Sequence, residues 1–156
     1  MFFIRSFLIA ACVFIGMHTV AQAAGTDADT KYIGSAACKQ CHEQEYERFF
    51  KYSKKAHSKR NVEKMRPKLS REELEGCYSC HTTGYGKKGG FVSYEQTPGL
   101  GDIGCETCHG PGAAHAESGE VASIIRKPSV ESCDVCHNAE LVRSFNFKPL
   151  RYSGAH

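Results

Sequence analysis

Cys38-Lys39-Gln40-Cys41-His42 is the stretch that decides the architecture of this chain, because its pattern returns three more times. The other copies are Cys77-Tyr78-Ser79-Cys80-His81, Cys105-Glu106-Thr107-Cys108-His109 and Cys133-Asp134-Val135-Cys136-His137. Composition alone would give roughly 0.03 Cys-x-x-Cys-His matches in a chain of this length. The copies use every cysteine except Cys12, so one chemistry is repeated along the sequence.

The spacing of these residues suits covalent attachment of haem. Two thiols three positions apart can form thioethers with the two vinyl groups of one haem, and the next histidine then lies under the iron. A zinc site would use two pairs for one ion and leave the histidines unexplained, and a redox dithiol would occur once, near a βαβ pattern. We therefore predict four c-type haems, with the eight motif cysteines as attachment points and His42, His81, His109 and His137 as proximal ligands.

The first 23 residues resemble a cleaved secretion signal. Arg5 gives a basic start, residues 7–17 are almost all apolar, and Ala21-Gln22-Ala23 fits a signal peptidase site. The apolar run is short for a membrane span. A lipoprotein site at Cys12 and an uncleaved anchor are the alternatives. We expect residues 24–156 to form one soluble periplasmic domain, with association with the membrane surface left open.

Composition favours a core built around the cofactors. Without residues 1–23 the chain has no Trp, few Leu and many Gly, Lys and Ser, so its own apolar content is low for its size. We expect the haems to form the core. The net charge of +3 for the whole chain is small and gives no reason to expect a nucleic acid partner.

Local patterns predict a mainly α fold with long loops and little β. Apolar periodicity predicts a helix from about 43 to 59, and Ser70-Arg71-Glu72-Glu73 is a capping box that opens a helix into the second motif. Residues 91–94 predict a short strand, and residues 113–126 a helix that Gly119 weakens.

The second axial ligands are limited by the number of histidines. Outside the motifs and the signal only His57, His115 and His156 remain, which predicts three bis-histidine irons and one exception. A continuous helix would place His57 roughly 22 Å from His42, so His57 should serve another haem. The turn Gly110-Pro111-Gly112 likewise directs His115 away from its own haem. For the fourth iron we prefer an open or water-bound site, with Met65 as the alternative.

Two stretches resemble the second and third haem segments of the tetrahaem cytochrome c-554 family: CYSCHTTGYGKKGGF (77–91) and GDIGCETCHGPG (101–112). The resemblance runs from about residue 32 to 137. It implies that His115 caps the first haem, His156 the third and His57 the fourth, that the haem on His81 is five-coordinate, and that the haems form stacked pairs. The family accepts electrons from hydroxylamine oxidoreductase in ammonia-oxidising bacteria. This chain departs from it by stopping at His156 and by a longer segment between His42 and His57.

These observations predict an electron carrier between redox proteins of a respiratory chain. Candidate partners are a multihaem oxidoreductase as donor, and a quinone-linked protein or another cytochrome as acceptor. The alternative is an enzyme that reduces nitric oxide, or a similar small ligand, at a five-coordinate haem on His81.

Overall fold

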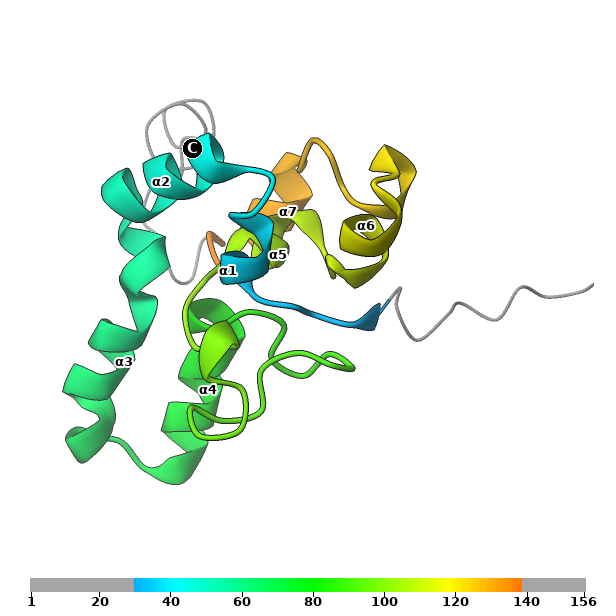
Figure 1. Ribbon diagram of the computed structural model, residues 1–156. Coiled ribbons are helices and arrows are strands. Elements are labelled where there is room, and N and C mark those ends of the chain that lie inside the picture. The colour runs from blue at the N-terminus through cyan, green and yellow to red at the C-terminus, as the bar shows by residue number, and fades with distance from the viewer. Residues whose placement is uncertain (1–29, 139–156) are drawn as a thin grey trace, which may run out of the picture.

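The computed structural model describes residues 30–138, and its ribbon is a set of short helices joined by long loops (Figure 1). The α-helices are α1 (Ser35–Cys38), α2 (Glu43–Tyr52), α3 (Ser58–Met65), α4 (Arg71–His81), α5 (Cys105–His109), α6 (Ala113–Ser118) and α7 (Val130–Asp134). Single 3-10 turns occupy Lys54–His57, Arg66–Lys68, Pro98–Leu100 and Val121–Ser123. Between residues 30 and 138 there is no β-strand, so the predicted mainly α fold class is confirmed. No helix in this range is long and apolar enough to cross a membrane.

Helices α3 and α4 form a hairpin at one end of the molecule (Figure 1). The predicted capping box is present at its bend: Ser70 N–H donates to Glu73 Oε2 at 2.8 Å, and Glu73 N–H donates to Ser70 Oγ at 3.3 Å. This box starts α4 and thereby presents the second motif on a continuous helix. Val62 of α3 is 3% exposed and belongs to a core cluster against which Cys77 and Tyr78 of α4 pack.

The single helix predicted for residues 43–59 is wrong. Helix α2 ends at Tyr52, because Ser53 takes an extended conformation (φ −87°, ψ 119°) that no helix can continue through. The chain then turns inward, and Ala56 is completely buried. His57 therefore does not continue the face of α2, and its distance from His42 cannot be counted at 1.5 Å per residue.

The predicted strand and the predicted length of the 113–126 helix are also wrong. Phe91 and Tyr94 are both buried although they are three residues apart, whereas a strand would turn them to opposite faces. The side-chain oxygens of Ser93 and Thr97 accept the backbone N–H groups of this loop in place of a strand partner. Helix α6 stops at Ser118 because Gly119 adopts the left-handed region (φ +73°).

The apolar core of the described part is small. Its largest cluster consists of Val62, Phe91, Tyr94 and Leu100, lined by Tyr32, Leu74, Cys77, Tyr78 and Tyr85. The largest fully buried side chains of this part are polar: Glu106, Thr82 and Thr83. A core of this size agrees with an interior that needs further apolar material to be complete.

Candidate haem-attachment site

Each Cys-x-x-Cys-His motif forms a helical turn. The second and third motifs lie within α4 and α5. In the first and fourth, His42 N–H donates to Cys38 O and His137 N–H to Cys133 O, both at 2.9 Å, which is the helical i to i−4 bond. Residues i, i+3 and i+4 share one side of a helical turn, so both thiols and the imidazole of a motif project together.

Motifs distant in sequence meet through their sulfur atoms. The Cys38 and Cys105 thiols are in hydrogen-bonding contact, which raises the pKa of Cys38 and lowers the pKa of Cys105 to about 6. Burial, with a hydrogen bond to Cys80, raises the pKa of Cys136 to about 12. The first motif thus lies against the third and the second against the fourth, and α1 packs on α5 at the centre of the molecule (Figure 1).

Backbone carbonyls orient two of the candidate histidine ligands. His109 Nδ1 lies 2.6 Å from Ile125 O, and His115 Nδ1 lies 3.0 Å from Glu120 O. A carbonyl oxygen only accepts, so Nδ1 carries the proton in each ring and the Nε2 lone pair is directed away from that carbonyl. This hydrogen bond from the second ring nitrogen is the usual support of a metal-binding histidine.

The rings of His42 and His115 lie close together, with nearly parallel planes, at the junction of α1, α2 and α6. Their centroids are 6.1 Å apart and their planes differ by 21°. Two imidazoles on one metal would have centroids roughly 6.2 Å apart, from two metal–nitrogen bonds of about 2 Å and about 1.1 Å within each ring. The spacing therefore fits an iron between these two side chains.

The other candidate ligands are placed differently. His57 Nε2 lies 3.0 Å from Phe50 O, so this nitrogen carries the proton and the lone pair is on Nδ1. His81 Nδ1 is buried and has no hydrogen-bond partner within residues 30–138. Burial, reinforced by the charge of Lys55, lowers the pKa of His137. Met65 ends α3 with 47% of its surface exposed, and His156 lies outside the described residues.

Together these side chains fit a covalently held haem. Each motif offers two thiols and one imidazole on the same side of a turn, which matches two vinyl groups and one axial position. The buried, unpartnered Nδ1 of His81 shows a polar group without its partner at such a turn. Cys77 and Tyr78 of the second motif pack against the largest apolar cluster of the described residues.

Glu106 is a buried residue whose importance sequence reasoning missed. It lies inside the third motif, is 2% exposed, and accepts hydrogen bonds from the backbone N–H groups of Ile33, Gly34 and Gly112. Its donors are distant in sequence, so no local pattern could identify it. The one available signal was a carboxylate flanked by Gly-rich segments at 101–104 and 110–112.

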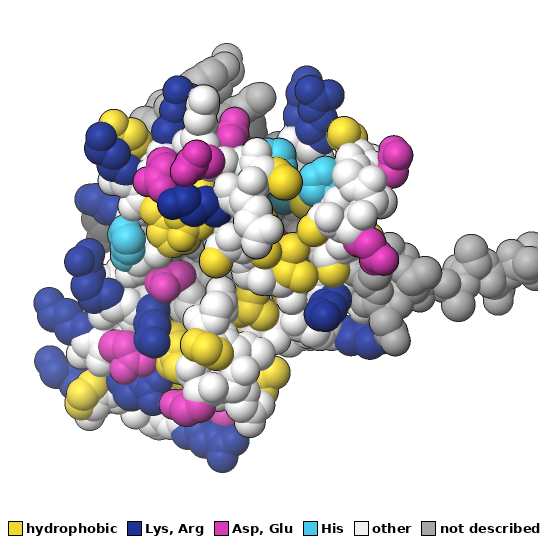
Figure 2. All heavy atoms as spheres, viewed as in Figure 1, with side chains coloured by type: hydrophobic (Ala, Val, Ile, Leu, Met, Phe, Trp, Pro, Cys, Tyr) yellow, Lys and Arg dark blue, Asp and Glu magenta, His cyan; other side chains and the backbone are white. Residues whose placement is uncertain are grey.

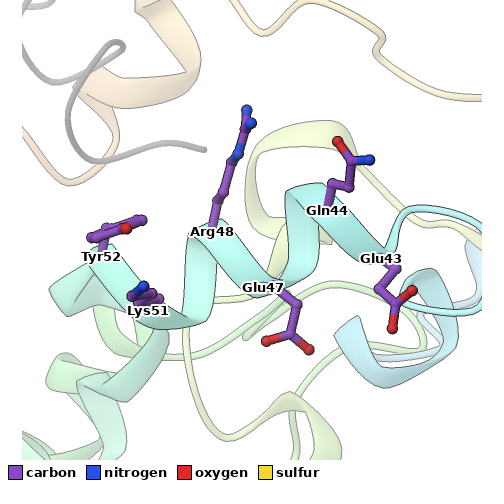
Figure 3. A pocket seen from close by; sticks show the side chains of 6 residues that line it. All are labelled: Glu43, Gln44, Glu47, Arg48, Lys51 and Tyr52. Atoms are coloured by element: carbon purple, nitrogen blue, oxygen red, sulfur yellow. The ribbon is translucent and has the colours of Figure 1, made fainter.

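A shallow depression on α2 lies apart from the motifs. Side chains from successive turns of this one helix line it (Figure 3): Glu43, Gln44, Glu47, Arg48, Lys51 and Tyr52. Its charges are mixed, and it contains none of the predicted site residues.

Comparison with known proteins agrees with the motif chemistry. Residues 37–110 match the family model described as cytochrome c554 and c-prime, a range that includes the first three motifs. Cytochrome c-554 of Nitrosomonas europaea is 29% identical over 131 residues, which cover 72% of this chain and 52% of the relative. The chain therefore spans about half the length of this curated relative. No solved structure matches the chain. Both matches support the cytochrome c-554 family for this protein.

Proposed function

We propose that this chain is an exported, periplasmic electron carrier of the cytochrome c-554 family, with four covalently attached c-type haems. The observation that carries the proposal is the contact between motifs through Cys38 and Cys105, and through Cys80 and Cys136. Haems attached through touching cysteines would be held as close neighbours, which is the arrangement that electron exchange requires. The small apolar core supports the same reading, since it leaves an interior for the cofactors to fill.

The chain supplies attachment and axial ligands in this proposal. The cysteines of each motif hold one haem, and His42, His81, His109 and His137 are the proximal ligands. His115 is the second ligand of the first haem, and its spacing from His42 supports this pairing. By the family resemblance, His156 serves the third haem and His57 the fourth. Binding through His57 Nε2 exchanges its hydrogen bond to Phe50 O for the metal.

When bound, haem supplies an iron that cycles between ferric and ferrous states. With a histidine pair bound to an iron, that iron would have no open position for a substrate, and its role would be to exchange electrons. Nitric oxide reduction at the haem on His81 remains the second candidate. Its supporting observation is that His81 has no histidine ring stacked against it in the described part, in contrast to His42.

Redox partners are proposed to dock on a basic face formed by α3 and its flanking turns. The face is defined by Lys54, Lys55, Lys59, Arg60, Lys64, Arg66 and Lys68, with Glu63 as the one acidic residue between 54 and 68. Figure 2 shows Lys and Arg side chains gathered along this side of the molecule. A predominantly basic face steers a partner of the opposite charge, so an acidic redox protein is the expected partner.

The basic face lies close to the attachment motifs. Ser58 at the start of α3 donates to His81 O at 2.8 Å, so this end of the face is in direct contact with the second motif. At the same end of the face, the charge of Lys55 reaches Cys108, Cys133 and His137 of the third and fourth motifs. A protein docked at the start of α3 would therefore approach the second, third and fourth motifs. Multihaem donors and quinone-linked or cytochrome acceptors are the candidate classes.

A reductive titration of the purified holoprotein tests this proposal. Visible spectra recorded during stepwise addition of reductant should show four electrons taken up per chain. Nitric oxide added to the reduced protein should leave the spectra of the bis-histidine haems unchanged. Uptake of fewer electrons would contradict the haem count, and catalytic consumption of nitric oxide would favour the enzyme instead.

A further inference from the structure

Glu106 occupies an unusual position for an ionisable residue. It is the first residue between the two cysteines of the third motif, where the other motifs have Lys39, Tyr78 and Asp134. A carboxylate is rarely buried to 2% exposure, because removal from water is costly unless hydrogen bonds compensate. The burial of Glu106 therefore requires partners that are specific to this location.

Three backbone donors compensate the carboxylate. Oε2 accepts from Gly34 N at 2.7 Å and from Ile33 N at 3.2 Å, and Oε1 accepts from Ile33 N at 2.9 Å and from Gly112 N at 2.7 Å. Hydrogen bonds to an ionised acceptor are the stronger class. Both oxygens are needed, since one holds the chain before α1 and the other also holds the turn before α6.

These donors lie at the start of the two helical segments that lead to His42 and His115. Gly34 is the N-cap of α1, which leads through Cys38 to His42. Gly112 is the N-cap of α6, which carries His115 in its first turn. A further bond from Ala113 N to Lys31 O at 3.3 Å ties the same two segments together. The spacing of the two rings thus depends on a carboxylate that belongs to neither segment.

We infer that Glu106 is a positioning residue for the axial pair of the first haem, and that it joins this haem site to the third motif. The inference rests on the proposed function, in which His42 and His115 bind one iron. Glutamine cannot replace Glu106, because its one carbonyl oxygen can accept from only one of the two segments. Its NH2 group would then meet the N–H donor of the other segment, and two donors cannot form a hydrogen bond.

Low-temperature electron paramagnetic resonance of the oxidised holoprotein tests the inference. In Glu106→Gln we expect a full haem content, loss of one low-spin signal, and a new high-spin signal. The lost signal is the one that His115→Ala removes. Asp134→Asn is the matched control, since it removes one charge at the same motif position on an exposed residue and should leave all signals unchanged.

A second variant tests the same inference if Glu106→Gln does not fold and acquire its haems. Alanine fits the backbone of Gly112 (φ −97°), but its Cβ would lie 3.1 Å from Glu106 Oε1 and push the carboxylate while keeping its charge. Gly112→Ala should shift the signal of the first haem alone. Wild-type spectra in both variants, or equal change at every haem, would overturn the inference. An unchanged spectrum in His115→Ala would instead overturn the ligand pairing of the proposed function.

Discussion

The imidazoles of His42 and His115 lie 6.1 Å apart between centroids, with planes 21° from parallel, although they come from different helices and distant parts of the sequence. Neither ring is buried. His115 is oriented by a hydrogen bond from Nδ1 to Glu120 O.

Replacing His115 by alanine should convert one haem from low-spin to high-spin. The change removes the second ligand of the first haem, while the thioethers of Cys38 and Cys41 keep the haem in place. Haem content should stay at the wild-type value, and electron paramagnetic resonance of the oxidised protein measures the spin state. If the two rings merely pack on each other, no spin state will change.

The basic face predicts electrostatic control of association. Lys64→Glu with Lys68→Glu should lower the rate of electron transfer from a reduced acidic flavodoxin by about tenfold at low ionic strength, because steering by a charged face is lost. Stopped-flow measurement at increasing salt should show the difference shrinking, since salt screens exposed charges. Lys87→Glu with Lys127→Glu changes the net charge equally away from this face. Equal slowing by both pairs would locate docking elsewhere.

The capping box at the start of α4 predicts a stability that falls in acid. Hydrogen bonds from the Ser70 backbone and side chain lower the pKa of Glu73 below its ordinary value of 4.5. A lowered folded-state pKa means that the stabilisation is complete above the unfolded value and is lost as pH falls through the folded value. Urea unfolding of wild type should therefore weaken below pH 4.5 more than that of Glu73→Gln.

Ser70→Ala removes the other half of the box and should cost about 1 kcal/mol at neutral pH. Glu72→Gln is the control for both variants, because Glu72 lies in the same turn and makes no capping contact there. A Glu72→Gln profile that matches Glu73→Gln would show that general charge, and not the cap, sets the acid sensitivity.

The aromatic cluster beside the second motif predicts a large effect of Phe91. It is 3% exposed and contacts the rings of Tyr78 and Tyr94 edge-on at centroid distances of 5.1 and 5.0 Å. Phe91→Ala should destabilise the holoprotein by about 3–5 kcal/mol in denaturant unfolding. Val92→Ala, at a neighbouring position that is 58% exposed, should change stability little. Comparable losses in the two variants would contradict the described core.

Features that depend on neighbours in sequence could be predicted. The Ser70–Glu73 box needs three residues of spacing and was found where expected. The motif turns follow for the same reason. The predicted helix over 43–59 is interrupted because Ser53 is extended, and Ala56 after it is buried against the rest of the fold. Such a long-range packing contact cannot be read from the periodicity of the sequence. The predicted strand failed because Phe91 and Tyr94 both turn inward from one loop.

The individual haem motifs could be predicted from the sequence, but the contacts between them could not. Eight cysteines and four histidines follow from a local pattern, and their placement on helical turns needs no tertiary information. Which motifs touch, as Cys38 touches Cys105, depends on long-range packing. The three backbone donors of Glu106 carry no side-chain signature, so its role could not be read from the sequence. The predicted ligand His156 and the predicted signal at 1–23 lie outside the described residues.

The most direct test of the central claim is the intact mass of the exported protein under denaturing conditions. We predict a mass that exceeds that of the processed polypeptide by four haems, with no motif cysteine accessible to thiol alkylation, because all eight sulfurs are in thioethers. A mass with fewer haems, with disulfides, or with alkylated motif cysteines would contradict the proposal that this chain is a tetrahaem electron carrier.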